Sequence, residues 1–369
     1  MIPVFRPFSD GKEIEYLKAV LDSGWWGMGS RTREFEEKFA AYIGRKYAIG
    51  LNSATAALDL AFKCIDIRNR EVITTPMTFV STNHAILYNQ GIPVFCDIEP
   101  DTLNIDASRI EALVTERTKA IIVVHYGGYA CAMDEIMSIA DKYNLYVVED
   151  CAHACGGEYR GRKLGSIGQA GCFSFQAVKN LSTGDGGMLV TDDPEWYDFL
   201  QKYRWVGITK DTFSRDKDGY DWFYDVVNLG HKFHMNDITA AIGLAQFEKL
   251  AWMNRRRQEL TMKYNNALRE LKQVEIPPVK SYMRPSYHNY VIKTEGREDL
   301  RTYLRERDIS TGVHYYPNHL YEMYKPYYRR LEVVETIWKK LVTLPLFPDL
   351  KEQEQDLIIN SIKDFFAPH

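Results

Sequence analysis

Short apolar runs alternate with helix-like segments between residues 34 and 191, and this alternation constrains the fold more than any other feature of the chain. The runs that we expect as strands are 47–53, 71–76, 93–99, 119–128, 145–152, 170–175 and 186–191. The segments that we expect as helices are 34–44, 55–65, 78–90, 107–114 and 133–144. Continuous apolar strands that alternate with helices are typical of a mostly parallel sheet covered on both faces.

The pattern changes in the second half of the chain. From about Asn236 a long helical pattern extends through 237–271, and the segment 274–286 then breaks it with three prolines. We therefore expect an α/β protein with two domains. The large domain covers 1–250, with 1–15 as an N-terminal arm, and a smaller α+β domain covers 251–369.

Charge and hydropathy limit the kinds of molecule and the cell compartment that we expect for this protein. The formal net charge is −4 and no long basic run occurs, so a nucleic acid is not expected. No stretch of about 18 apolar residues is present, so no membrane span is expected. The segment 1–17 has no apolar core of signal-peptide length, and a cytoplasmic location is therefore expected.

Three residues in the segment 151–155 raise the possibility of a metal site. Cys151, His153 and Cys155 alternate there, as ligands on a strand could. However, the segment lacks a second pair of ligands, and a structural zinc ion usually has four well-spaced ones. We expect small buried thiols and no metal.

Lys179 lies between two runs that we expect to be buried strands, 170–175 and 186–191. Lysine is among the residues that are least often buried without a partner. Either its ammonium group reaches solvent over a strand end, or the protein holds it inside for chemistry.

Three other segments follow strands and would meet Lys179 at the carboxyl edge of the sheet, where open α/β proteins bind ligands. Small residues at 53–55 lead directly into a helix, whose N-terminus can hold a phosphate, although a plain helix cap is an equal alternative. Glu149 and Asp150 end an apolar strand, where a structural ion pair is the alternative. Phe79 follows another strand.

These four features together indicate pyridoxal phosphate. Its phosphate would bind at the helix N-terminus, and Phe79 would cover its ring. Asp150 would keep the ring nitrogen protonated, and Lys179 would form a Schiff base with the aldehyde and later move a proton.

Several longer motifs resemble one enzyme family over nearly the whole chain. They are "NSATAALDLA", "TPMTFVSTNHAI", "PVFCDIEPDTLNID", "VVEDCAHACG", "SFQAVKNLSTGDGGMLVT", "DITAAIGLAQFEKL" and "TGVHYYPNH". In these motifs the chain resembles the DegT/DnrJ/StrS-type sugar aminotransferases, which are fold-type-I pyridoxal-phosphate enzymes. "GWWGMGSRTREFEE" and "GHKFHMNDITAAI" make it most similar to the branch that forms 4-amino-4-deoxy-L-arabinose on a UDP carrier.

The resemblance implies a role for each matching residue. It gives Lys179 the Schiff base and Asp150 the pyridine nitrogen. It implies that the other cofactor contacts are made by Ala54, Thr55, Phe79, His153, Ser174 and Lys232. Of these, His153 would reach the ring hydroxyl, and Lys232 would bind the cofactor phosphate of a neighbouring subunit. A homodimer with shared active sites is therefore expected.

The substrate side is less well defined. The segment 313–319 approaches the active site in the family, so the candidate substrate contacts are His314, Tyr315, His319 and Asp185. For Asp185 a role in forming a turn is an equal alternative. The aperiodic segment 205–232 offers Lys210, Arg215 and Lys217 as partners for a diphosphate. Met28, Gln176 and His234 differ from many relatives, which leaves the sugar open.

We therefore expect a transaminase that moves the amino group of L-glutamate to a ketone, at C4, of a nucleotide-linked sugar. Its products would enter surface glycans such as lipopolysaccharide, capsule or O-antigen. The alternatives within transaminases are a C3-keto sugar, a cyclitol or a small phosphorylated ketone. A sugar dehydratase of the same fold is less favoured, because relatives with that activity have histidine in place of the lysine. A non-catalytic regulator also remains an alternative.

Overall fold

The computed structural model describes residues 1–217 and 222–367, and a seven-stranded sheet lies at its centre. In spatial order the strands are β1 (Tyr47–Leu51), β9 (Gly187–Thr191), β8 (Ala170–Ser174), β5 (Tyr146–Asp150), β4 (Thr118–Val124), β2 (Glu71–Thr74) and β3 (Ile92–Phe95). β9 is antiparallel to both of its neighbours, and the other adjacent strands are parallel. The expected mostly parallel α/β sheet is therefore confirmed.

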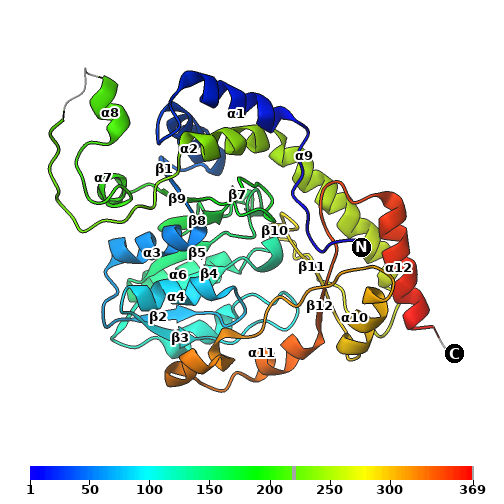
Figure 1. The fold of residues 1–369 in the computed structure, drawn as a ribbon. Coiled ribbons are helices and arrows are strands. Elements are labelled where there is room, and N and C mark those ends of the chain that lie inside the picture. Colours follow the sequence, from blue (N-terminus) through cyan, green and yellow to red (C-terminus); the bar gives the residue numbers. More distant parts are fainter. Residues whose placement is uncertain (218–221, 368–369) are drawn as a thin grey trace.

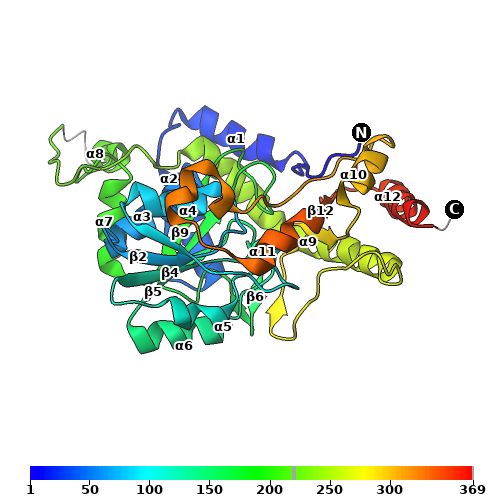
Figure 2. The ribbon, with the colours of Figure 1, turned by 90° about the horizontal axis from the view of Figure 1, so that it is seen from below.

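Helices cover both faces of this sheet (Figures 1 and 2). One face packs on α3 (Ala54–Ile65), α4 (Val80–Tyr88) and α7 (Pro194–Tyr203), and the other on α2 (Ser30–Ile43), α6 (Met133–Tyr143) and α9 (Asp237–Leu268). Successive strand residues point to opposite faces, so Val147 joins one buried cluster and Val148 the other. Because both faces are covered, the strands are mostly apolar, and the polar residues lie chiefly near the strand ends, such as Glu149 and Asp150 on β5.

The long helix α9 begins after Asn236, whose side chain accepts a hydrogen bond from the Thr239 N–H group. α1 (Lys12–Ser23) packs along its first half, and α12 (Glu352–Phe365) packs near its end (Figure 1). Beyond α9 the chain forms an antiparallel pair of β11 (Tyr290–Lys293) with β12 (Leu341–Leu344), and α10 (Arg297–Arg305) lies between them in sequence. A small three-stranded sheet joins β6 (Glu158–Tyr159), β7 (Arg162–Lys163) and β10 (Met283–Arg284).

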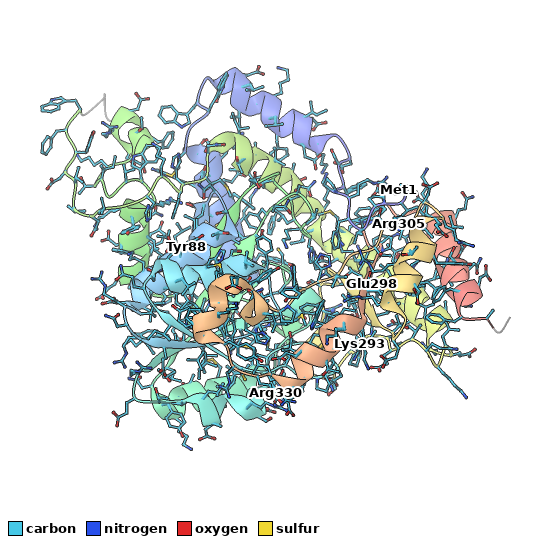
Figure 3. The ribbon with its side chains drawn as sticks, turned by 60° about the horizontal axis from the view of Figure 1, so that its bottom comes forward. Met1, Tyr88, Lys293, Glu298, Arg305 and Arg330 are labelled. Atoms are coloured by element: carbon cyan, nitrogen blue, oxygen red, sulfur yellow. The ribbon has the colours of Figure 1, made fainter. Side chains whose placement is uncertain are left out.

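The first residues of the chain lie on its C-terminal part. Ile2 forms a parallel bridge with Ile309, and Arg6 forms an ion pair with Asp349 at 2.7 Å. Figure 3 shows Met1 beside Arg305 of α10. The expected arm therefore contacts the region that we assigned to the small domain, while the division at residue 250 stays a prediction.

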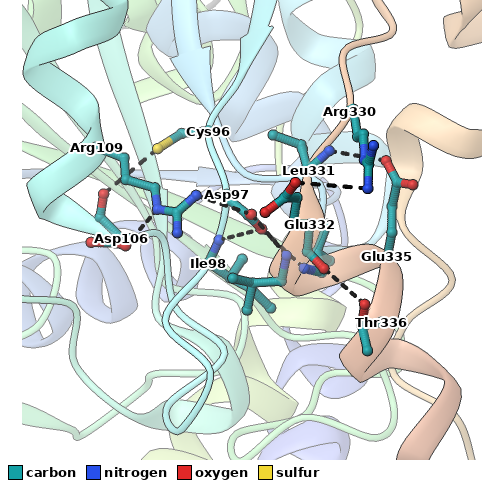
Figure 4. A network of polar contacts seen from close by, with 12 residues as sticks. Cys96, Asp97, Ile98, Asp106, Arg109, Arg330, Leu331, Glu332, Glu335 and Thr336 are labelled. Carbon is teal, nitrogen blue, oxygen red and sulfur yellow. Dashed lines mark hydrogen bonds and ion pairs between the residues drawn. The ribbon is translucent and has the colours of Figure 1, made fainter.

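A C-terminal segment returns to the edge of the large sheet. Asp97, which follows β3, accepts hydrogen bonds from the N–H groups of Val333 and Val334 at 3.0 Å each, at the start of α11 (Glu332–Ile337). Figure 4 shows this network, in which Arg109 also approaches Asp97. Asp97 is buried, and this anchor holds the start of α11 at the edge of the sheet next to β3.

In the described part of the segment 205–232, the short helix α8 (Thr212–Lys217) lies on an extension that leaves the body of the molecule (Figure 1). Across the residues that the structure describes, no helix is long and apolar enough to cross a membrane.

Candidate active site

A cavity of about 460 Å³ lies at the carboxyl ends of the central strands. Ten of the residues expected from the sequence line it: Ala54, Thr55, Phe79, Asp150, His153, Ser174, Lys179, Asp185, His314 and Tyr315. They come from five separate parts of the chain, 54–55, 79, 150–153, 174–185 and 314–315. Their convergence on one cavity is what the strand-end argument predicts.

Lys179 reaches this cavity from the turn that joins β8 to β9. The Lys179 N–H group donates to the Gln176 carbonyl at 2.9 Å, which fixes the turn. The protein that surrounds the amine lowers the pKa of Lys179 to about 8, and the charge of Asp150 opposes this shift. A substantial fraction of the amine is therefore neutral, and nucleophilic, near physiological pH.

Asp150 ends β5 and points into the cavity. Its carboxylate accepts hydrogen bonds from the Thr82 hydroxyl at 2.7 Å and the Ala152 N–H group at 3.0 Å. Burial raises the pKa of Asp150, while these two bonds and the ammonium of Lys179 lower it. Thr82 is a site residue that the sequence reasoning missed, because a threonine inside a helix has no distinguishing signal.

Glu149 points away from the cavity, since neighbouring strand residues face opposite ways. It accepts N–H groups from Gly165, Ile167 and Gly168, and its carboxylate contacts His125 Nε2 at 3.0 Å. Burial raises the pKa of Glu149. The hydrogen bond and charge of His125, together with the bonds from the backbone N–H groups, lower it and leave it below its usual value. Of the two alternatives for this acidic pair, Glu149 therefore has the structural one, a buried ion pair, and takes no part in the cavity.

The N-terminus of α3 forms one wall. The Ser53 hydroxyl accepts from the Ala56 N–H group. The N–H groups of Ala54 and Thr55 lie in the first turn of the helix and therefore have no partner within it. Gly187 of β9 lies so close that an added Cβ would stand 2.3 Å from the Ser53 carbonyl carbon. This glycine brings β9 and the helix start together, and Ser174 lines the same cavity.

Three rings form the remaining walls. Phe79 is 59% exposed at the opening and lies 6.5 Å from Tyr315, centroid to centroid. Burial holds the pKa of His153 well below its usual value, so this ring is neutral. His153 Nδ1 accepts from the Gly127 N–H group at 3.3 Å, and therefore Nε2 carries the proton and donates it to the Tyr315 hydroxyl at 3.0 Å.

Two contacts hold the segment with Tyr315 over the cavity. His314 Nδ1 lies 2.8 Å from the Thr343 hydroxyl on β12, and burial lowers the pKa of His314 to about 4. Asn318 donates its backbone N–H to the Pro76 carbonyl and its amide to the Thr78 carbonyl. Asn318 was not expected from the sequence, because its partners lie about 240 residues earlier in the chain.

Several expected residues do not line the cavity. His319 is buried elsewhere, where its Nε2 atom lies 3.1 Å from Glu335, and the expectation that it contacts the substrate finds no support in its position. Lys232 places its ammonium 3.5 Å from the centre of the Trp205 ring. Lys210 and Arg215 also lie outside the cavity lining, and the side chain of Lys217 lies outside the described residues.

The residues present suit pyridoxal phosphate. Free N–H groups at a helix start fit a phosphate, and a buried carboxylate fits a protonated ring nitrogen. A lysine with a lowered pKa fits an aldehyde, and all three groups line one cavity.

Comparisons with known proteins agree with this geometry. The sequence profile of the DegT/DnrJ/EryC1/StrS aminotransferase family matches residues 7–363. The spore coat polysaccharide biosynthesis protein SpsC of Bacillus subtilis is 38% identical over 98% of this chain and 96% of its own.

Solved structures are similar over the same length. The putative sugar aminotransferase Spr1654 of Streptococcus pneumoniae, in its PMP-form, is 30% identical with a TM-score of 0.93, over 99% of this chain and 98% of its own. A PLP-form of Spr1654 has a TM-score of 0.91. Helicobacter pylori PseC, an aminotransferase involved in the biosynthesis of pseudoaminic acid, is 29% identical with a TM-score of 0.93, over 99% of both chains.

Proposed function

The chain belongs to the DegT/DnrJ/EryC1/StrS aminotransferase family, and on this premise we propose that it transfers the amino group of L-glutamate to the C4 ketone of a nucleotide-linked sugar. It is a sugar aminotransferase that uses pyridoxal phosphate. The observation that carries the proposal is the convergence of Lys179, Asp150 and the start of α3 on one cavity. Two similar proteins are named for biosynthesis: SpsC for a spore coat polysaccharide and PseC for pseudoaminic acid.

Several residues that line the cavity have a role in this proposal. The N–H groups of Ala54 and Thr55, together with Ser174, hold the cofactor phosphate. Phe79 covers one face of the ring. The Nε2–H group of His153 is directed at a hydroxyl, at present that of Tyr315, and can turn to the hydroxyl of the cofactor ring.

Bound in this way, the cofactor supplies an aldehyde that takes up the amino group and a ring that withdraws electrons from the carbon that loses a proton. Asp150 contributes a buried negative charge that keeps the ring nitrogen protonated. The pKa of Lys179 is about 8, so its Nζ atom can accept the proton that the amino acid loses and can donate that proton again later in the transfer. His314 and Tyr315 line the side from which the sugar enters.

A homodimer with shared sites is part of the proposal. Among the described residues that line the cavity, Lys179 is the one lysine or arginine, although the cofactor phosphate, a nucleotide diphosphate and glutamate all carry negative charge. The extension 205–229 exposes large apolar side chains, with Leu229 92% and Trp222 73% exposed. We infer that this extension packs on a second copy and that Lys232 binds the phosphate there.

A mixing experiment tests the shared site. Lys179→Ala and Lys232→Ala each remove one component of the site, and each variant alone is expected to be nearly inactive. If the residues act across the interface, refolding the two together regenerates one intact site per mixed dimer, and activity returns. No recovery, together with a monomeric mass by light scattering, would refute the shared site.

The substrate is tested separately. The enzyme is reduced with glutamate, and the aldehyde absorbance is followed after the addition of UDP-, dTDP- and GDP-linked keto-sugars, with a cyclitol ketone and a small phosphorylated ketone as alternatives. A C4-keto nucleotide sugar is expected to restore the absorbance fastest. A faster response to a C3-keto sugar or to one of the alternatives would replace the proposed substrate.

A further inference from the structure

Asn180 follows Lys179 directly and uses every hydrogen-bonding group of its side chain. Its Nδ2 atom donates to Asn254 Oδ1 at 2.8 Å and to the Ser286 carbonyl at 2.7 Å. Its Oδ1 atom lies 3.1 Å from His288 Nδ1. The side chain is 3% exposed, so water does not compete for these hydrogen bonds. Asn180 therefore ties the turn of the lysine to α9 and to the segment before β11.

The direction of these bonds is fixed. Asn254 donates its own amide to the Cys155 carbonyl at 2.9 Å, so its Oδ1 atom must face Asn180 as an acceptor. Both partners of Asn180 Nδ2 are then acceptors, and Asn180 Oδ1 faces His288. It follows that Nδ1 of His288 carries a hydrogen, which it donates to Asn180.

The ring of His288 lies in a stack that reaches the cavity. Phe5 stacks on one side at 5.4 Å and His153 on the other at 4.4 Å. His153 stacks in turn toward Tyr315 at 6.0 Å, and its Nε2–H group points to the hydroxyl of that tyrosine. The orientation of His153 therefore depends on the ring behind it, which Asn180 holds.

The charges around His288 favour a neutral ring. The titratable groups that face it are His153, Lys179, His314 and Arg257, and none of them is an acid. Burial, with these neighbours, holds the pKa of His288 well below its usual value. Lys179, by contrast, faces Asp150. A charged group at position 180 would disturb both the neutral state of His288 and the charge environment of Lys179.

We propose that Asn180 is a positioning residue for the transamination reaction. Its amide fixes the turn that carries Lys179 and, through the neutral ring of His288, the direction of His153. The C-terminal half of the chain thus sets the geometry of two groups that face the cofactor. This inference rests on the roles proposed above for Lys179 and His153.

Two variants of the holoenzyme test the proposal. Asn180→Ala removes the amide, and Asn180→Asp keeps its volume but replaces two donors with oxygen. Asn89→Ala is the matched control, because Asn89 is buried and its Nδ2 atom binds Asp59 and Ala85 away from the cavity. For each variant we would measure the pH midpoint of the absorbance band of the cofactor–lysine linkage and the rate of the glutamate half-reaction.

We expect Asn180→Ala to slow the half-reaction about ten- to a hundredfold, because small displacements of a reacting group have effects of this size. Asn180→Asp should raise the pH midpoint by about one unit, since an added carboxylate favours the protonated linkage. Asn89→Ala should lower the melting temperature and leave the midpoint and the rate per loaded site unchanged.

A merely structural Asn180 would give a different result. If fully loaded Asn180→Ala keeps the wild-type midpoint and the wild-type rate, the proposal is overturned. Where the alanine variant does not fold, Asn180→Asp decides, and an unchanged midpoint overturns the proposal. The role of Lys179 fails separately, if Lys179→Ala retains a band that borohydride removes.

Discussion

Asp150→Asn is the substitution whose effect the structure defines most closely. The side chain keeps its shape, and Asn Oδ1 can still accept the Ala152 N–H group. The new amide would face the Thr82 hydroxyl, which can become an acceptor by donating its own hydrogen to Thr78, 2.7 Å away. Both heavy atoms of the new amide then keep a partner, so folding stability should change by only about 1 kcal/mol.

The effect on activity should be much larger. A neutral amide cannot hold a proton on the ring nitrogen, so the electron-withdrawing power of the ring falls. Losing one such electrostatic interaction in a catalytic site costs about 10²- to 10³-fold in kcat, or about 3 kcal/mol. The pKa of Lys179 should also fall below its present value of about 8, because Asp150 is the charge that raises it.

The assay is a single-turnover measurement with glutamate, followed by cofactor absorbance at equal loading. Glu149→Gln is the control, since it makes the same chemical change one residue earlier on the opposite face of β5. There it places an amide against backbone N–H groups, and it should cost about 3 kcal/mol of stability. Its rate per loaded site should be normal. An Asp150→Asn enzyme with the wild-type rate would refute the reasoning.

Three further predictions concern the lysine, the phosphate site and the sheet edge. Uptake of pyridoxal phosphate by the apoenzyme should rise about tenfold from pH 6 to 7 and level off above about pH 8, because the neutral amine of Lys179 reacts; a rise that continues to about pH 10 would show an ordinary lysine pKa. Gly187→Ala should weaken cofactor binding at least tenfold in a fluorescence titration, because its Cβ would displace the start of α3; unchanged affinity would contradict the close approach. Asp97→Ala should lower the free energy of unfolding by about 1–3 kcal/mol in thermal unfolding, because it leaves two N–H groups of α11 without an acceptor. An unchanged melting curve would argue against this anchor.

The sequence predicted the central sheet well because its signal is local. A strand that is buried on both faces is mostly apolar, and the helices between strands have their own period and their own ends. The same logic located the site, since residues that follow parallel strands must meet at one edge. This logic brought Lys179 and Asp150 to one edge of the sheet, the family resemblance strengthened the assignment, and both residues line the cavity.

What the sequence could not predict depends on distant contacts. His319 was expected, with His314, to contact the substrate, but in the short 3-10 helix η3 (Asn318–Leu320) its ring lies against Glu335. The tethers Asp97 and Asn318 were missed because their partners lie hundreds of residues away. Proximity in the chain does not say which way a side chain turns, and polar anchors have no period.

The most direct test of the account is chemical labelling of the lysine. The holoenzyme is treated with borohydride and digested with trypsin, and the fragments are sequenced by mass spectrometry. We expect the cofactor on Lys179, where it blocks cleavage and yields a single labelled peptide, 164–202. A label on another lysine, or complete cleavage after residue 179 with no label, would contradict the account.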